Sequence, residues 1–390
     1  MKQTNELYIG LMSGTSLDGI DVALINLKTD QCQLISHYFH PLNQSIKERL
    51  ILLSSPTNKN NSPLESNIKR NQSKRIELLA ELDVIMANQF AEAANKLLQQ
   101  SQLTAKDIIA VGSHGQTVRH RPNNHFPFSI QIGDANIIAE KTGITTVADF
   151  RRADLAAGGQ GAPLAPAFHN AILRSNKEDR IVLNLGGIAN VTFLPKNKKA
   201  DVIGFDTGPA NTLLDAYYIK NHNNREYDFD KNAEFAQQGI NNQALLNLLI
   251  NDPYFQMDFP KSTGREYFSL NWLEQKILQI NKPINHEDIQ ATLLQLTVLS
   301  IAESIQKLNL ENYSIFACGG GMHNHYLLTQ LSQKINHPIQ TTNDLNVDGD
   351  YLEAMTFAWL AKQRLQGLPG NIPSVTGASK RKVLGGVYLP

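Results

Sequence analysis

Two aspartates and two glycines share a short stretch near the start of the chain. Residues 7–21 predict a strand, a turn of small and hydroxyl residues, and a second strand that continues to residue 27. Gly14 and Gly19 carry no Cβ, so backbone N–H groups there can approach a polyphosphate closely. Asp18 and Asp21 offer carboxylate oxygens, which Mg²⁺ prefers. We interpret this turn as a nucleotide phosphate loop. The alternatives are an ordinary hairpin turn, and aspartates that only accept hydrogen bonds from neighbouring N–H groups.

The same pattern returns in the middle of the chain. Residues 181–194 again predict strand, turn and strand, with Gly186 and Gly187 in the turn and Asn190 after it. A duplicated hairpin implies two phosphate-binding turns, one per domain, that face each other across a cleft. A third glycine segment, 319–321, lies between a predicted strand and a predicted helix, a geometry that accommodates a nucleotide. For this segment, a tight strand-to-helix link is the alternative.

Asp206 stands at the carboxyl end of the strand predicted after the second hairpin. Open α/β sheets place their ligands at this edge, and a carboxylate there can orient and deprotonate a nucleophile. We therefore expect Asp206 to be a general base. Two structural alternatives remain, because Asp206 can also cap the helix that begins near Thr212 or brace the turn at Gly208.

The elements that position these residues follow from hydrophobic spacing and turn signals. A chain of 390 residues exceeds the size of one hydrophobic core, so we expect two domains. We place the first at residues 1–148 plus about 350–390 and the second at 149–349. The expected elements include a helix over 74–100, strands over 108–112, 128–132 and 145–148, a functional loop over 149–163, and a helix over 351–365 that packs back on the first domain.

Composition limits the partners. The 36 basic residues balance 36 acidic ones, which gives no electrostatic footprint for nucleic acid or for an anionic membrane. Two cysteines are too few for a disulfide framework. No signal-peptide pattern is present, and no run approaches the ~18 apolar residues that span a bilayer. We expect a soluble, cytoplasmic protein without nucleic-acid or membrane partners.

With these motifs in place, the chain resembles the sugar kinase, Hsp70 and actin superfamily, and within it the anhydro-N-acetylmuramic acid kinase family. The resemblance covers nearly the whole chain. It is carried by residues 10–21, 112–117, 131–134, 149–168, 183–190, 204–215, 260–268, 318–324, 348–360 and 375–384. It implies a two-domain actin-like ATPase (ribonuclease H-like) α/β fold, with mixed sheets flanked by helices and with ATP and sugar in the interdomain cleft.

The resemblance also implies an activity. Enzymes of this family use ATP to phosphorylate the 6-oxygen of anhydro-N-acetylmuramic acid while water opens the 1,6-anhydro bridge, in the recycling of peptidoglycan. ATP and Mg²⁺, a small-molecule sugar substrate and a homodimer are then expected. Two other functions remain open: an ordinary hexosamine kinase of the same fold, and a non-catalytic, sugar-responsive ATPase.

The site residues follow from these motifs. Asp206 is the expected catalytic base that activates water, and Asp18 and Asp21 are the Mg²⁺ candidates. For the sugar, arginine suits a lactyl carboxylate, because its planar fork binds carboxylates bidentately. The sugar candidates are Glu353, Arg151, Arg152, Asp154 and His114. The ATP candidates are Gly14, Thr15, Ser16, Leu17, Asp18, Gly19, Ile20, Asp21, Gly186, Gly187, Asn190, Gly319, Gly320 and Gly321.

Two of the sugar candidates have alternatives, and the chain departs from the family pattern in two places. Glu353 can form a capping pair with Asp350 at a helix start, and His114 can be a satisfied histidine beside a strand end. The Asn-rich stretch at residues 57–73 looks like a lengthened loop. Asn232 occupies a position where we expect glycine.

Overall fold

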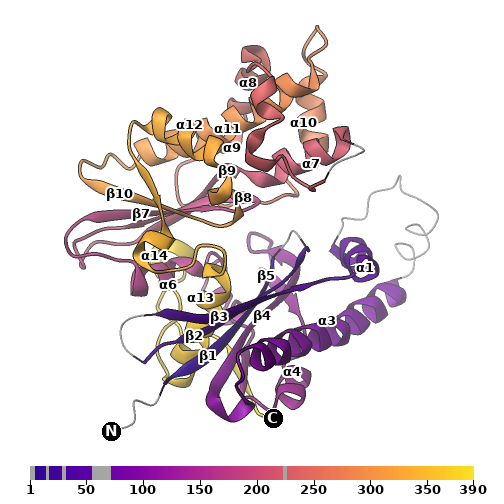
Figure 1. Cartoon of the computed structure of the whole chain (residues 1–390), viewed down its shortest axis with the longest axis vertical. Coiled ribbons are helices and arrows are strands. Elements are labelled where there is room, and N and C mark those ends of the chain that lie inside the picture. Colours follow the sequence, from indigo (N-terminus) through magenta and orange to yellow (C-terminus); the bar gives the residue numbers. More distant parts are fainter. Residues whose placement is uncertain (1–4, 15–16, 29–31, 55–71, 223–225) are drawn as a thin grey trace. The chain divides into compact units, whose positions relative to one another are not determined.

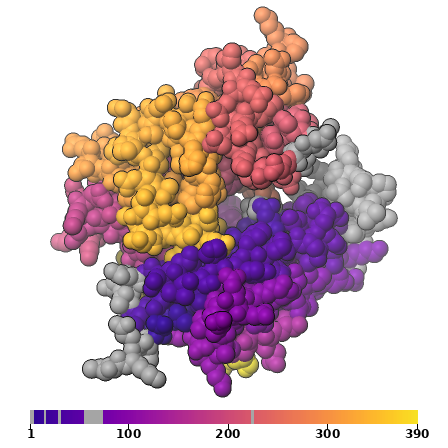
Figure 2. Space-filling model, viewed as in Figure 1, coloured from indigo at the N-terminus to yellow at the C-terminus, as the bar shows by residue number. Residues whose placement is uncertain are grey.

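The computed structural model describes residues 5–14, 17–28, 32–54, 72–222 and 226–390. The chain divides into unit 1, residues 1–172 and 351–390, and unit 2, residues 173–350. The first crossing between the units falls after Ile172, later in the chain than the boundary expected at Asp149. In Figure 2, yellow atoms of the C-terminal segment lie among the purple atoms of unit 1.

Unit 1 is built on a sheet whose strand order is β12-β6-β4-β1-β2-β3, with β5 paired to β4. β1 and β2 form the antiparallel hairpin expected from the glycine turn, and β4 runs parallel to β1 on its other side. The strands are β1 (Leu7–Ser13), β2 (Gly19–Asn26), β3 (Gln33–Pro41), β4 (Ile108–Arg121), β5 (Phe128–Ile132), β6 (Thr146–Ala148) and β12 (Gly386–Tyr388).

Helices cover both faces of this sheet (Figure 1). α1 (Gln44–Ser54), α3 (Gln72–Gln100) and α4 (Ala135–Thr142) share one apolar core with β1, β2 and β4. α13 (Leu352–Leu365) packs on β1 and β4, as expected for the last long helix. It approaches so closely that a Cβ at Gly10 would lie 1.8 Å from the Ala354 carbonyl oxygen, and one at Gly112 would lie 2.0 Å from that of Phe357. Glycine is therefore required where α13 crosses the sheet.

Shorter helices complete unit 1. They are the 3₁₀ turn η1 (Ala105–Asp107) and the helices α5 (Arg152–Leu155), α6 (Ala165–Ile172) and α14 (Pro373–Thr376). The loop expected over 149–163 therefore contains a helical turn. β4 extends well beyond Gly112, because residues 116–121 pair with β5. The sequence did not lead us to expect α1, and most of the Asn-rich stretch, 55–71, lies outside the described residues.

Unit 2 repeats the arrangement with a sheet of order β11-β10-β7-β8-β9. Its strands are β7 (Asp179–Leu185), β8 (Ile188–Leu194), β9 (Ile203–Pro209), β10 (Tyr313–Cys318) and β11 (Ile339–Thr341). β7, β8 and β9 are antiparallel neighbours, and β10 is parallel to β7. In both units the first strand lies between its antiparallel hairpin partner and a parallel strand. This duplicated order confirms the actin-like, ribonuclease H-like fold class.

The helices of unit 2 pack around a core that includes Leu183, Phe205 and Leu293. They are α7 (Asn211–Asn221), α8 (Gln243–Ile250), α9 (Pro253–Gln256), α10 (Leu270–Ile277), α11 (His286–Gln306) and α12 (His325–Ile335), with 3₁₀ turns η2 (Lys231–Ala233), η3 (Ala236–Gln238), η4 (Gly320–His323) and η5 (Thr342–Leu345). Asn232 has φ 51°, a left-handed conformation that asparagine tolerates better than most residues. It thus adopts the backbone for which we expected glycine. Among the described residues, no helix is long and apolar enough to cross a membrane.

Candidate active site

Asp206 lies on β9 and is fixed at three points. Its backbone N–H donates to the carbonyl oxygen of Lys261 at 3.0 Å, and its own carbonyl oxygen accepts from the Tyr254 hydroxyl at 2.7 Å. Its carboxylate Oδ2 accepts from the backbone N–H of Thr263 at 2.9 Å. Asp206 therefore does not cap α7, whose N-cap is Ala210. Its hydrogen bonds go to the segment over 254–263 rather than to the turn at Gly208. One carboxylate oxygen is held while the other remains available to accept a proton.

The charge state of Asp206 suits a base. Partial burial raises the pKa of its carboxyl to about 7. The hydrogen bond from the Thr263 N–H acts in the opposite direction, because it stabilises the ionised form and so lowers the pKa. A general base works best when its pKa lies near the operating pH. The loop that carries Thr263 is itself anchored, because the buried Lys261 ammonium donates to the Tyr254 carbonyl oxygen at 3.2 Å and lies 4.7 Å from the centre of the Tyr254 ring.

Asp206 belongs to a polar row across unit 2. Asn190 on β8 pairs with Asp206 on one side and with Asn184 on β7 on the other. Directly opposed residues of antiparallel strands point to the same face. Their sequence neighbours Leu183 and Phe205 enter the apolar core, so the row points to the opposite face. The sheet therefore presents Asn184, Asn190 and Asp206 side by side.

The glycines of the two turns in unit 2 fall into two classes. A Cβ at Gly187 would meet the Thr212 hydroxyl at 2.5 Å, one at Gly319 the Asn184 Oδ1 at 2.4 Å, and one at Gly321 the Leu185 Cβ at 2.7 Å. Packing within the protein therefore requires glycine at these three positions. A Cβ at Gly186 would have its first neighbour at 3.6 Å, and one at Gly320 would meet nothing within 4 Å. Space is therefore left beside Gly186 and Gly320, which fits the close approach of a ligand.

The first hairpin holds the remaining ATP candidates, in unit 1. Thr15 and Ser16 lie outside the described residues. Leu17 and Ile20 are buried in the core, so only their backbone can face a ligand. Gly14 is half-buried at the turn, Asp18 is exposed, and Asp21 is half-buried on β2. A Cβ at Gly19 would meet the Phe39 ring and the His40 carbonyl oxygen, each at 2.5 Å, so packing alone requires this glycine.

Gln116 on β4 connects this hairpin to the centre of the sheet. Its Nε2 donates to the Gly14 carbonyl oxygen at 3.3 Å. The hydroxyl of Ser13 lies 2.6 Å from Gln116 Oε1 and 3.0 Å from the carbonyl oxygen of Gly19. Both ends of the turn are thus fixed by the side chains of Ser13 and Gln116.

Within the described ranges, no three His, Cys, Asp or Glu side chains form a group able to hold a metal ion. Mg²⁺ that arrives with a nucleotide binds through one or two carboxylates together with phosphates and waters, so it needs no such group. Asp18 and Asp21 remain the candidates.

Arg151 and His114 form the centre of the sugar candidates in unit 1. Arg151 Nε and Nη2 lie 3.1 and 2.8 Å from His114 Nε2, and Nη1 donates to the Gly161 carbonyl oxygen at 2.7 Å. Guanidinium can only donate, so Nε2 is an acceptor and the ring is neutral. Burial and the Arg151 charge lower the pKa of His114 well below its usual range. His114 therefore positions Arg151.

Asp154 is fully buried. Its carboxylate accepts from the Gly161 N–H at 2.8 Å, the Asn371 amide at 2.6 Å and the Thr376 hydroxyl at 2.8 Å. These contacts tie the loop after β6 to the C-terminal segment. Asp154 thus shapes this loop, and Arg152 is exposed and paired with Asp149 at 3.6 Å.

Glu353 lies in the first turn of α13, near Arg151. Although its side chain keeps contact with solvent, loss of hydration raises the pKa of its carboxyl, and the Arg151 charge opposes that rise. Burial lowers the pKa of the Arg151 guanidinium to about 10, although the negative charges of Glu353 and Asp154 act to raise it. The capping pair with Asp350 does not form, because Asp350 bonds to His323 at 2.9 Å.

Three positioning residues were not singled out from the sequence: Asn184, Gln116 and Thr263. Asn184 and Gln116 lie inside recognised motifs, and their polar side chains in otherwise apolar strands are a usable signal. Thr263 acts through its backbone N–H, which no residue type reveals. Its only signal is the polar loop over 261–266.

Comparison with known proteins identifies the family. The model of the family described as anhydro-N-acetylmuramic acid kinase matches residues 6–390. A relative of that name from Coxiella burnetii (strain RSA 493 / Nine Mile phase I) is 46% identical and covers 98% of this chain and 97% of its own. Another from Pasteurella multocida (strain Pm70) is 46% identical over 100% and 98%, and one from Vibrio vulnificus (strain YJ016) is 44% identical over 99% of each. The chain belongs to the anhydro-N-acetylmuramic acid kinase family.

Proposed function

We propose that this chain is an ATP-dependent kinase that phosphorylates the 6-oxygen of 1,6-anhydro-N-acetylmuramic acid and opens its anhydro bridge with water. The products are N-acetylmuramic acid 6-phosphate and ADP, as expected in peptidoglycan recycling. Membership of the family supports this function along the whole chain. The observation that carries it is Asp206, a carboxylate with a pKa of about 7 that is held at three points.

The reaction needs one base. Asp206 Oδ1 accepts a proton from water, and the water oxygen bonds to the anomeric carbon as the bond from that carbon to the bridge oxygen breaks. The bridge oxygen takes that electron pair and attacks the γ-phosphorus of ATP, and ADP leaves. Thr263 holds Oδ2 meanwhile, so Oδ1 keeps its direction. A single carboxylate thereby promotes both bond changes.

The remaining candidates take the following proposed roles. The open space beside Gly186 and Gly320 and the amides of the first turn, Gly14 to Asp21, support ATP binding. Mg²⁺, with Asp18 or Asp21 as ligand, would neutralise charge on the transferring phosphoryl group. Arg151 suits the lactyl carboxylate, and Glu353 a sugar hydroxyl. His114 and Asp154 act through Arg151 and its loop.

One experiment tests the reaction. The purified chain is incubated with Mg-ATP and anhydro-N-acetylmuramic acid, N-acetylmuramic acid or N-acetylglucosamine in ¹⁸O-water, and products are weighed at early times. We expect the anhydro sugar to gain one phosphoryl group and one labelled oxygen. The two free sugars are the matched controls. Turnover of the free sugars alone would identify an ordinary hexosamine kinase instead.

We also propose a homodimer in the cytoplasm. Large apolar side chains that remain exposed on unit 1 support an association surface: Ile76 is 69% exposed and Phe128 37%, beside a hollow that they line with Leu53 and Leu79. Light scattering coupled to size exclusion tests the oligomer, and the result expected is twice the mass of one chain. Fractionation of cells that express the chain tests the compartment.

A further inference from the structure

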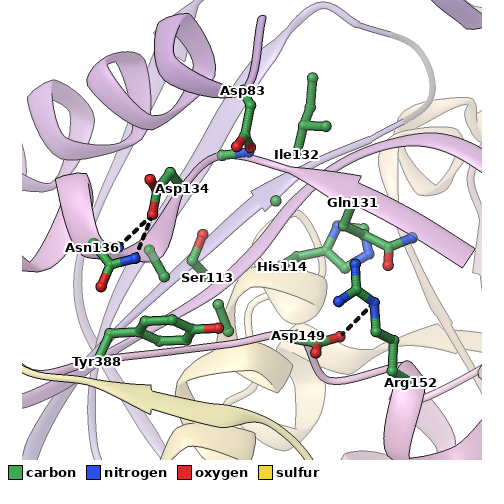
Figure 3. Close-up of a pocket in the computed structure, with 14 residues that line it drawn as sticks. Asp83, Ser113, His114, Gln131, Ile132, Asp134, Asn136, Asp149, Arg152 and Tyr388 are labelled. Atoms are coloured by element: carbon green, nitrogen blue, oxygen red, sulfur yellow. Dashed lines mark hydrogen bonds and ion pairs between the residues drawn. The ribbon is translucent and has the colours of Figure 1, made fainter. Parts of the chain in front are cut away.

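Unit 1 contains a polar pocket of about 210 Å³ that the proposed reaction does not use. Figure 3 shows its wall, to which α3 contributes Asp83, β4 Ser113, α4 Asn136 and β12 Tyr388. At about 30 Å³ for each water of liquid volume, the pocket holds roughly seven waters. That is approximately the space of one six-carbon sugar.

Within the pocket wall, Ser113 and His114 lie on opposite faces of β4. Side chains alternate along a strand. A Cβ at Gly112 would touch α13, and the His114 ring lies 4.6 Å from that of Phe357, so these residues face α13. Val111 belongs to the core shared with α3 and α4, so Ser113 points to that side. His114, which also contacts Arg151, lines the pocket as well.

Ser113 is 1% exposed, and its hydroxyl has no hydrogen-bond partner among the residues that the structure describes. Burying a hydroxyl without a partner is unfavourable. In Figure 3 this hydroxyl points toward the segment that carries Asp134 and away from the Tyr388 ring. A ligand hydroxyl in the pocket would satisfy it.

The charges of the wall select the ligand. The lining residues include three aspartates, Asp83, Asp134 and Asp149. Arg152 is the one arginine or lysine among them, and His114 is neutral. Asp83 Oδ1 accepts from the Gly133 N–H at 2.6 Å, and Asp134 Oδ1 from the Asn136 N–H at 2.8 Å. The second oxygen of each carboxylate can accept from a ligand. The excess of acceptors favours hydroxyl and ammonium groups and repels anions.

We propose that this pocket is a second binding site, for a monosaccharide without negative charge, with an amino sugar favoured over its N-acetyl form. The hydroxyl of Ser113 and the amide of Asn136 bond to sugar hydroxyls, the carboxylates accept from hydroxyl or ammonium groups, and the Tyr388 ring offers an apolar face with a polar tip. ATP, anhydro-N-acetylmuramic acid and N-acetylmuramic acid 6-phosphate are anions, so the pocket excludes the substrates and the sugar product of the proposed reaction.

The test measures binding of glucosamine, N-acetylglucosamine and N-acetylmuramic acid to the full chain by calorimetry, with anhydro-N-acetylmuramic acid at saturation. N-Acetylmuramic acid is N-acetylglucosamine with an added carboxylate, so this pair isolates the effect of charge. We expect glucosamine to bind more tightly than N-acetylglucosamine, and N-acetylmuramic acid not to bind. The proposal would be overturned if saturating anhydro sugar displaced both glucosamine and N-acetylglucosamine. It would also be overturned if N-acetylmuramic acid bound more tightly than these two sugars.

Variants locate the site. Ser113→Ala is expected to weaken glucosamine about tenfold, as for one lost hydrogen bond to a charged or strongly polar ligand. Asp83→Asn keeps the oxygen that accepts from Gly133 but removes the charge, and is expected to weaken glucosamine more than N-acetylglucosamine. The matched control is Ser101→Ala, because the Ser101 hydroxyl is also without a partner in the described part of the chain but lies outside the pocket. Equal affinity of Ser113→Ala and Ser101→Ala for glucosamine would refute the site.

Discussion

At the scale of single residues, the proposed chemistry depends on how Asp206 is held. A carboxylate at a strand end is ordinary, but here the backbone on both sides of it and one of its oxygens are fixed by the segment over 254–263. Preorganised groups contribute to catalysis because they need not reorganise during the reaction. The base and the loop that holds it should therefore respond to mutation in different ways.

Asp206→Asn removes the base without changing the size of the side chain. We expect turnover to fall by about 10²-fold or more, the usual contribution of general-base catalysis. The anhydro sugar should still bind, because an amide retains an oxygen toward Thr263. Initial rates of the variant and its affinity for the anhydro sugar test this expectation. Near-normal turnover with intact binding would exclude Asp206 as the base.

The pH profile reports the same group. Asp206 must be ionised to act, so kcat/KM should fall as pH drops through about 7. The Thr263 N–H lowers the pKa of Asp206 by favouring the charged form, so its loss in Thr263→Pro should move the acidic limb of the profile to higher pH. Thr263→Ala keeps the N–H and serves as the control with an unchanged limb. A limb at the same pH in all three proteins would show that another group titrates.

At the scale of elements, the triple-glycine turn contains both structural and ligand-facing positions. Gly320→Ala introduces a Cβ into open space, so we expect unaltered stability but a KM for ATP raised about tenfold or more, since ~1.4 kcal/mol of lost binding corresponds to that factor. Gly321→Ala is the counterpart, because its Cβ would lie 2.7 Å from that of Leu185. It should lower the melting temperature. Steady-state kinetics and thermal melts of both variants separate the two roles, and equal behaviour would contradict this division.

The loop after β6 depends on Asp154. Asp154→Ala removes the acceptor of three hydrogen bonds, from Gly161, Asn371 and Thr376. The Asn371 amide and the Thr376 hydroxyl then keep only longer bonds to backbone carbonyl oxygens. At ~1–3 kcal/mol for each unsatisfied buried group, we expect a loss of about 3 kcal/mol or more in the free energy of unfolding. The exposed Asp107, whose carboxylate bonds to Thr104, is the control, and Asp107→Ala should cost much less than Asp154→Ala. Denaturant titrations measure both, and equal losses would show that the three contacts contribute little.

The sequence predicted the elements better than the contacts between them. The duplicated hairpins and the long helices α3 and α13 follow from local periodicity and glycine turns, and all are present. The extension of β4 depends on its pairing with β5. α5 carries Asp154, whose hydrogen bonds go to residues outside this helix. Both are tertiary effects. Asp206, Arg151 and the glycine turns could be named as candidates in advance. The Thr263 N–H and the neutral state of His114 could not, because both depend on which groups meet in space.

At the scale of the whole molecule, the two units differ in continuity although their sheets share one strand order. Unit 2 is a single stretch, whereas unit 1 needs α13 and β12 from the end of the chain. We expect residues 173–350 alone to unfold cooperatively, and residues 1–172 alone to lack a cooperative transition until residues 351–390 are added. Circular dichroism melts of the fragments test this. A cooperative melt of 1–172 by itself would contradict it.

The close fit of α13 against Gly10 and Gly112 has a consequence for synthesis. The β1–β2 hairpin leaves the ribosome long before α13, the helix that covers its sheet. Domains generally fold as units during synthesis, so the middle of the chain can reach its final form while the beginning still waits for the end. A prematurely terminated polypeptide would then carry an uncovered apolar sheet face instead of a working nucleotide site, which marks it for removal by cellular quality control rather than for partial activity.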